Sequence, residues 1–344
     1  MANIENNSIT LTDLEFQELL KKTIRSSKTV ITRYPPHLII NGSKVAASRG
    51  LTQISGAEKS GKSALTQMII AKYLDVNSES IYDTKAMEVL PNKKGKAIIH
   101  FDTEQSDEDH IDGLKNIEKR ASQDQPNWFY SYGLAAINFL KYQDFVDKTC
   151  EFLSKKHKGV HAIFIDGGAD FVPSVNDEVK SNQLLAFFTE IAHRFECPVY
   201  YIMHTNPNSS KERGHLGSGS GRKCYATVQV EIDDKAISSV KITKARRGRS
   251  GDGFKFKWSD EHMMHMESDE EYNEGSDLNL IKIEQNKIDA ASVLGQSSYT
   301  YTEVRNKTME VLIVSSKSAE RKIKFWKDNA IVSIGSDRRY RLNN

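Results

Sequence analysis

The sequence predicts an α/β fold with a largely parallel central sheet. From about residue 38 to residue 260, short apolar runs alternate with stretches of helical spacing, which is typical of this class. One apolar run leads into a glycine-rich turn and then a helix, and other apolar runs end on acidic residues. Because ligands bind at the carboxyl ends of the strands in open α/β sheets, these observations predict a functional site at that edge.

The whole-chain numbers exclude several classes of protein. The 344 residues can form one sizeable core and an accessory domain, and a net charge of +2 means that any basic surface is local. Cys150, Cys197 and Cys224 lie far apart without metal-ligand spacing, which favours a reducing compartment. No apolar run approaches the roughly 18 residues of a membrane span, and the N-terminus has no signal-peptide pattern. We therefore expect a cytoplasmic protein without a membrane partner.

Residues 1–37 are polar at first and then predict one amphipathic helix. Thr12 has the character of an N-cap with Glu15 three residues later, and the helix should extend through Lys22. A Pro-Pro pair at 35–36 ends this lead-in. Two interpretations remain open, namely a helix packed on the core and a tether that reaches a neighbouring subunit.

Seven apolar runs are strand candidates within the region from 38 to 266. The main candidates are residues 51–54, 97–101, 162–165 and 199–203. Three further runs would extend the sheet with antiparallel strands, at residues 228–232, 240–242 and 254–258. The acidic segment 267–277, which is poor in large apolar residues, is typical of a solvated linker.

Residues 278–344 predict a separate unit. A helix at 278–293 is followed by YTEVRNKTMEVL, by SAERKIKFWKDNAI and by a small hairpin that turns at 335–336, an order that resembles a winged helix-turn-helix. From 301 to 344, ten Lys/Arg residues oppose five Asp/Glu residues, and this local charge of +5 attracts phosphate backbone. The candidate DNA-binding residues are Lys317, Arg321, Lys322, Arg338 and Arg339. The alternatives are a helical cap with a solvated basic face and a protein-interaction module.

Residues 56–63 read GAEKSGKS, a complete match to the phosphate-binding pattern G-x-x-x-x-G-K-[ST]. Gly56 and Gly61 let the backbone turn tightly, so that its N–H groups and the following helix N-terminus face the phosphates. In such a motif Lys62 reaches the β- and γ-phosphates, and the Ser63 hydroxyl ligates Mg²⁺. The alternative is a glycine-rich turn with a surface lysine. The motif predicts binding of a nucleoside triphosphate, taken as ATP, by Gly56, Ala57, Glu58, Lys59, Ser60, Gly61, Lys62 and Ser63.

Two strand ends supply the acidic residues that a phosphate loop requires. AIFIDGGADF ends a strand on Asp166, which we expect to hold Mg²⁺ with Ser63, while Asp170 is a weaker candidate that would equally cap the next segment. AIIHFDTEQS delivers Asp102 and Glu104 towards the same edge, and Glu104 is our candidate for the base that polarises the attacking water. The alternative for Glu104 is a cap on the helix that starts near residue 106.

In sequence order, GAEKSGKS, HFDTEQS, IFIDGG, YIMHTNPN, GHLGSGSGRKCYATVQVEI and ITKARRGRSGDGFKF resemble the RecA-like ATPase core. The MH pair at 203–204 and the GHLGS run resemble the RepA-like hexameric helicases of plasmids and mobile elements. The resemblance implies that His204 senses the γ-phosphate; taken alone, a histidine at a strand end is more often a satisfied core residue. It also implies that the loop 206–223 contacts single-stranded DNA with little sequence preference, through Lys211, Arg213, Arg222 and Lys223. A disordered surface excursion is the alternative for this loop.

The segment TKARRGRSGDG is similar to the pattern that hexameric helicases insert into the neighbouring subunit's nucleotide site. On that resemblance Lys244 and Arg246 act in trans on the γ-phosphate, although Arg247 and Arg249 lie close enough for the register to slip. The alternative is a basic hairpin that contacts nucleic acid directly. The segment 261–267, EHMMHME, matches no helical zinc motif and is interpreted as the frayed end of a terminal strand.

The resemblance implies a Mg²⁺-dependent ATPase that forms a ring, most simply a hexamer, and translocates on single-stranded DNA in replication or mobilisation of a mobile element. Residues 278–344 would then recruit the ring to DNA or to an initiator or primase. Two alternatives stay open. The first is a recombinase-like filament or clamp ATPase that does not unwind DNA, and the second is a DNA-binding regulator that uses the nucleotide only as a switch.

Overall fold

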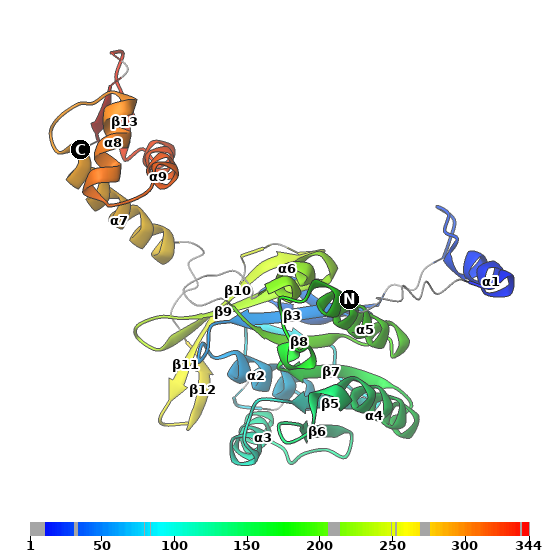
Figure 1. Ribbon diagram of the computed structural model, residues 1–344. Helices are drawn as coiled ribbons and strands as arrows, with labels where there is room; N and C mark the ends of the chain where they lie inside the picture. Colours follow the sequence, from blue (N-terminus) through cyan, green and yellow to red (C-terminus); the bar gives the residue numbers. More distant parts are fainter. Residues whose placement is uncertain are drawn as a thin grey trace.

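The computed structural model describes residues 11–30, 34–78, 80–82, 84–205, 214–248, 250–251, 253–268, 276–337 and 339–343. For residues 215, 218, 220–222 and 276–284 it describes the backbone alone. Within these ranges the fold is α/β, as predicted, with one large and mostly parallel sheet (Figure 1).

The described part of the central sheet has nine strands in the order β12-β11-β10-β9-β3-β8-β7-β5-β6. The strands from β9 to β6 in this order run parallel, whereas β10, β11 and β12 are antiparallel to their neighbours. The bounds are β3 (Leu51–Gly56), β5 (Ala97–Asp102), β6 (Phe129–Gly133), β7 (Val160–Asp166), β8 (Val199–His204), β9 (Ala226–Ile232), β10 (Ile237–Ala245), β11 (Lys255–Ser259) and β12 (Met264–Glu267).

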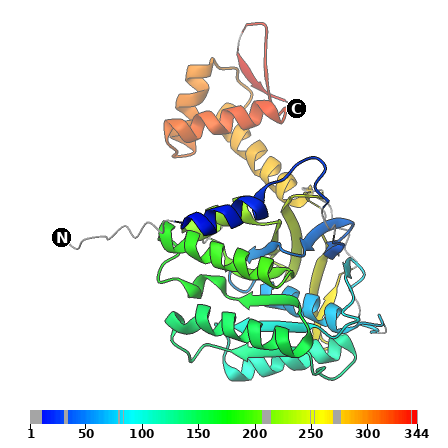
Figure 2. The same cartoon turned by 90° about the vertical axis from the view of Figure 1, so that its right-hand side faces the viewer.

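Helices cover both faces of the sheet, because its central strands alternate buried apolar side chains between two cores. On β7, Phe164 joins the core that contains α2, whereas Ile163 and Ile165 join the core that contains α4 and α5. Figures 1 and 2 show these helices around the sheet. The helices are α2 (Lys62–Leu74), α3 (Asp107–Ala121), α4 (Tyr142–His157), α5 (Glu178–Arg194) and α6 (Gly214–Lys223), with short 3-10 turns η1 (Phe139–Lys141) and η2 (Gly168–Phe171).

The seven predicted strands are all present, but the strands differ from expectation in four respects. The central sheet also contains β6, which the sequence analysis did not predict. β9 is parallel to β3 rather than antiparallel, because it enters the sheet beside the phosphate-loop strand after α6. The segment predicted to fray, 261–267, contains β12, which pairs with β11 through four residues in register. A small antiparallel sheet that sequence patterns did not indicate packs on the α2 side; its strands are β1 (Pro36–Ile40), β2 (Ser43–Ala47) and β4 (Met87–Val89).

The predicted N-terminal helix is present as α1 (Asp13–Thr23). Its N-cap is Thr12, and Thr12 and Glu15 form the expected capping box. All residues of the helix are exposed, and the Leu14 side chain is 72% exposed. The helix therefore does not pack on the core of its own chain, which leaves the tether as the interpretation to be tested.

The C-terminal elements occur in the predicted order and enclose a cluster of their own. They are α7 (Ser276–Leu294), α8 (Tyr301–Val311), α9 (Ser316–Asp328) and a hairpin of β13 (Val332–Ile334) and β14 (Tyr340–Leu342). Val304, Ile323 and Trp326 are buried at the centre, and the Trp326 indole donates to Asn286 Oδ1 over 2.9 Å. Figure 2 shows this unit beyond α7. None of the helices that the structure describes is long and apolar enough to cross a membrane.

Candidate active site

The phosphate loop lies between β3 and α2, as its pattern predicts, and two glycines make its shape possible. Gly61 has φ 98°, in the left-handed region that favours glycine, and it directly precedes the first residue of α2. A Cβ on Gly56 would lie 2.4 Å from the Val230 carbonyl oxygen. The backbone therefore turns sharply and directs the N-terminus of α2 into the cleft, an arrangement suited to anions.

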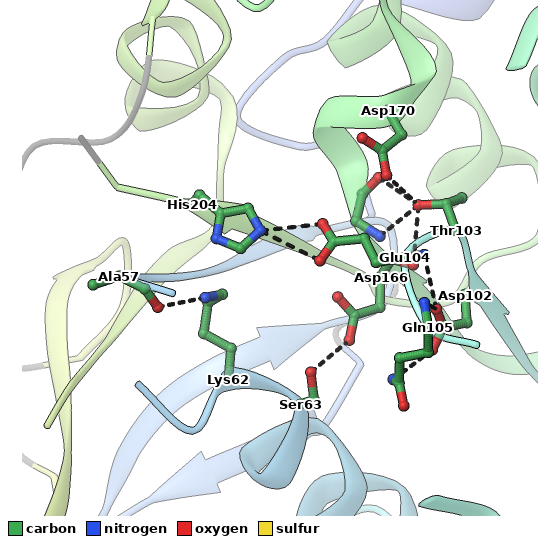
Figure 3. A network of polar contacts seen from close by, with 11 residues as sticks. Ala57, Lys62, Ser63, Asp102, Thr103, Glu104, Gln105, Asp166, Asp170 and His204 are labelled. Atoms are coloured by element: carbon green, nitrogen blue, oxygen red, sulfur yellow. Dashed lines mark hydrogen bonds and ion pairs between the residues drawn. The ribbon is translucent and has the colours of Figure 1, made fainter. Parts of the chain in front are cut away.

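Lys62 and Ser63 are the first two residues of α2 and point towards the strand ends (Figure 3). The Lys62 ammonium donates to the Ala57 carbonyl oxygen of its own loop over 2.6 Å. Burial lowers the Lys62 pKa, and the carboxylates of Glu104, Asp166 and Glu58 partly offset this effect. The Lys62 ammonium is thus held beside the phosphate loop, which is the position of the lysine that contacts a bound triphosphate in such loops.

Ser63 and Asp166 meet as the predicted Mg²⁺ ligands. The Ser63 hydroxyl donates to Asp166 Oδ2 over 3.2 Å, and Asp166 is buried at the end of β7. Burial raises the Asp166 pKa to about 7, with further contributions from the neighbouring charges of Asp102 and Glu104. A hydroxyl and a carboxylate are hard oxygen donors, and the surplus of negative charge around them suits a divalent cation. The residues present therefore fit Mg²⁺.

Glu104 and His204 face each other from the ends of β5 and β8 (Figure 3). His204 Nε2 lies 3.2 Å from Oε1 and 3.3 Å from Oε2 of Glu104. The hydrogen bond from His204 is the main cause that lowers the Glu104 pKa, which keeps the carboxylate ionised as a base requires. Glu104 does not cap α3, because Ser106 is the N-cap and accepts the Asp109 amide over 3.1 Å.

Thr103 and Gln105, which the sequence analysis did not single out, hold this arrangement together with Asp102 and Asp170. The Thr103 hydroxyl accepts from the Gly167 amide over 2.9 Å and lies 2.7 Å from Asp170 Oδ2, which it serves as donor. Asp102 accepts from the amides of Glu104 and Gln105, over 3.0 and 2.9 Å. Asp170 thus pairs with Thr103 rather than with Ser63. The polar residues after β5 could be recognised in the sequence as candidates. Their hydrogen-bond partners after β7 could not be predicted from it.

Gly167 lies against the Glu104 side chain, so that an added Cβ would overlap the carboxylate. We expect Gly167→Ala to fold, because the clashing group is the end of a flexible side chain, but to displace Glu104 from His204. The predicted result is a reduction of the kcat for ATP hydrolysis by at least about tenfold with ATP affinity little changed. Gly168→Ala, whose Cβ would approach Tyr201 at 3.2 Å, is the neighbouring control. Equal kcat values for Gly167→Ala and the native protein would contradict this role of Gly167.

Lys244 and Arg246 lie away from the phosphate loop of their own chain. Arg246 follows β10, and its amide donates to the Tyr225 carbonyl, while the Tyr225 amide donates to Leu51 at the start of β3. The loop begins at the other end of β3. The Arg246 guanidinium bonds the carbonyls of Cys224 and Lys223, both over 3.1 Å. Arg246 therefore cannot serve the site of its own subunit; Arg249 lies outside the described residues.

The loop predicted at 206–223 is partly a helix, which corrects the sequence-based interpretation. Residues 214–223 form α6, whose Leu216 is buried against the α5 side of the core. Among the DNA-binding candidates, Lys223 is exposed, Lys211 and Arg213 lie outside the described residues, and Arg222 is described by its backbone alone.

The C-terminal candidates divide into exposed and paired residues. Lys317, Arg321 and Lys324 are exposed on α9, and their spacing places them on one face. Lys322 instead forms an ion pair with Asp289 of α7, so its assignment to DNA binding is not supported by its position. Arg339 donates to the Ser298 carbonyl over 3.4 Å, and Arg338 lies outside the described residues. Lys324 is an exposed residue of this face that the sequence analysis did not include among the DNA-binding candidates.

No protein-family model matches this chain, and no curated protein matches it significantly in sequence. The solved structures that match include the crystal structure of the RadB recombinase, at 16% sequence identity and a TM-score of 0.41. That match covers 64% of this chain and 90% of the RadB chain. In the present structure, the phosphate loop follows β3, and the acidic strand ends belong to β5 and β7 of a mostly parallel sheet.

Proposed function

We propose that this chain is a Mg²⁺-dependent ATPase with a RecA-like core that acts on DNA. The observation that carries the proposal is the convergence of Lys62, Ser63, Asp166, Glu104 and His204 at one edge of the sheet. These residues come from α2 and from three different strands, and together they supply phosphate-binding, cation-binding and basic groups. A glycine-rich turn with only a structural role would not require these groups at one edge of the sheet.

Each side chain has a distinct role in hydrolysis. The loop amides and Lys62 bind the β- and γ-phosphates, and Ser63 and Asp166 hold Mg²⁺, which neutralises phosphate charge when bound. Glu104, kept ionised by His204, orients the attacking water and accepts its proton. His204 contacts both carboxylate oxygens of Glu104. A γ-phosphate that forms a hydrogen bond with the His204 imidazole therefore also changes the position of Glu104.

We further propose that active sites are shared between subunits in a ring, most simply a hexamer. The support is the position of Arg246 at the end of β3 opposite the phosphate loop, together with α1, which packs on no part of its own core. A head-to-tail interface would bring Arg246 and Lys244 to the neighbour's γ-phosphate and α1 to the neighbour's surface. A filament satisfies the same contacts and remains the alternative assembly.

The finer proposal is a helicase of the type found in plasmids and mobile elements, with residues 278–344 as a winged-helix unit. The test is ATP-driven strand separation on a forked DNA duplex. We expect unwinding by the native protein and by Asp144→Asn, whose carboxylate makes an exposed pair with Lys148, and none by Glu104→Gln. DNA-stimulated hydrolysis without strand release would favour the filament or clamp instead.

The exposed basic face of α9 supports DNA contact by the C-terminal unit. We expect the triple variant Lys317→Glu, Arg321→Glu, Lys324→Glu to weaken DNA binding at low salt, because each lost phosphate contact flattens the salt dependence by about 0.9 in log–log slope. Fluorescence anisotropy with single-stranded and duplex DNA measures both quantities. Lys115→Glu, a charge reversal on an exposed face of α3, is the control for a surface change away from α9. An unchanged slope would favour a protein partner for this unit, such as an initiator or primase.

A further inference from the structure

The cleft at the phosphate loop extends beyond the residues assigned to the triphosphate. In addition to Lys62, Ser63, Asp166, Glu104 and His204, it is lined by Gln67 of α2, Asn116 of α3, Trp258 of β11 and His265 of β12. None of these four residues has a role in the hydrolysis derived above. A triphosphate on the loop leaves the sugar and base of the nucleotide to occupy the remaining part of the same cleft.

Trp258 is a large aromatic side chain that stays exposed at this cleft. The residue is 44% exposed, and its indole Nε1 donates to Asp260 Oδ1 over 3.0 Å, which favours one orientation of the ring. The ring also packs edge-on against His265, with centroids 5.4 Å apart and planes at 80°. An indole that is oriented in advance costs little ordering entropy when a flat ligand stacks on it.

The hairpin that carries Trp258 is anchored to the helix next to the phosphate loop. Lys119 of α3 donates to the His262 carbonyl over 2.7 Å, and Arg120 donates to the His265 carbonyl. Burial, together with the charge of Arg120, lowers the His265 pKa, so the imidazole is uncharged at neutral pH. The pair of Trp258 and His265, which we call the Trp258 platform, is therefore held in place relative to α3 and is uncharged.

Two carboxamides line the same cleft as the aromatic pair. Gln67 and Asn116 are partly buried, and their side chains make no hydrogen bond to the described residues. A carboxamide presents one donor and one acceptor side by side, and this pattern pairs with the N6 amino group and N7 of adenine. Guanine presents two acceptors at the same edge, O6 and N7, and cannot make both bonds. A site built to make such bonds rejects a base that leaves them unmade.

We propose that Trp258 stacks the nucleobase and that Gln67 and Asn116 read its edge, which makes adenine nucleotides the preferred substrates. This inference rests on the nucleotide site proposed above and adds the base-recognition half to it.

The test compares binding of Mg²⁺-ATP and of inorganic tripolyphosphate to the full-length chain by calorimetry and tryptophan fluorescence. Trp258→Ala should lower ATP affinity by at least about fivefold, the usual loss when a stacking side chain is truncated, and should leave tripolyphosphate affinity unchanged. Trp258→Phe should restore most of the affinity while losing the fluorescence response to ATP. Trp128→Phe, with its indole beside Gly95, is the control and should retain that response.

The outcomes separate this inference from the proposal beneath it. If Trp258→Ala keeps the native ratio of ATP to tripolyphosphate affinity, the stacking platform is wrong while the phosphate site stands. If the native protein binds neither ATP nor tripolyphosphate, both the proposed phosphate site and the proposed stacking by Trp258 are wrong. The double variant Gln67→Leu, Asn116→Leu should lose a preference for ATP over GTP that the native protein shows. Equal native affinities for ATP and GTP would overturn the adenine assignment.

Discussion

Replacing Glu104 by glutamine should lower the kcat for ATP hydrolysis by about 10²- to 10⁴-fold, the usual contribution of a general base. The amide keeps the size of the side chain but cannot accept the proton of the attacking water. ATP affinity should change little, because Lys62 and the loop amides bind the phosphates and Glu104 lies beside His204. Steady-state hydrolysis and equilibrium ATP binding, measured on the same preparation, give the two quantities.

The controls for this variant are chosen from the same acidic cluster and from the surface. Asp170→Asn removes a carboxylate that pairs with Thr103, and we expect a smaller effect than that of Glu104→Gln. Asp144→Asn, in an exposed pair on α4, should behave like the native protein. A kcat for Glu104→Gln within about threefold of the native value would remove Glu104 from the role of base.

Arg246→Ala should also abolish most hydrolysis, by about 10³-fold or more, if the arginine acts on the neighbour's γ-phosphate. The more decisive experiment mixes two inactive variants. An interface at which one subunit supplies Glu104 and the next supplies Arg246 is complete, so mixed Glu104→Gln and Arg246→Ala subunits should recover activity. Random mixing of a head-to-tail assembly would give about a quarter of the native interfaces.

Recovery in the mixture would separate action in trans from a defect in folding. Arg247→Ala tests the register, since Arg247 lies next in the chain and lines the same surface groove as Arg246. If Arg247→Ala rather than Arg246→Ala is inactive and complements Glu104→Gln, then Arg247 is the arginine that acts on the neighbour's γ-phosphate. No recovery with either variant would contradict a shared active site and would favour direct nucleic-acid contact by this hairpin.

The part of the site that follows one chain segment was predictable from the sequence. The phosphate loop needs only its own glycines and the start of α2, and Asp166 ends an apolar run that could only be a buried strand. The contact between Glu104 and His204 joins the ends of β5 and β8, which are separated in the sheet by β7. Sequence patterns do not give strand order, so this contact was not predicted.

Other features depend on tertiary packing that overrides local composition. Residues 214–223 are rich in glycine and serine, which predicts a loop, but the burial of Leu216 on the α5 side of the core makes a helix favourable. Lys322 has the charge expected of a DNA contact, yet it pairs with Asp289 across two helices. Trp258 and His265 reach the nucleotide cleft because β12 extends the sheet, where the sequence indicated only a frayed end.

The most direct test of the central claim is steady-state ATP hydrolysis by the full-length native protein, with and without Mg²⁺ and single-stranded DNA, over a range of protein concentrations. We predict Mg²⁺-dependent turnover that DNA stimulates and whose specific activity rises with protein concentration as subunits assemble. Turnover no higher than that of Glu104→Gln, with Mg²⁺ and DNA both present at the highest concentration, would contradict an ATPase and leave the nucleotide as a switch.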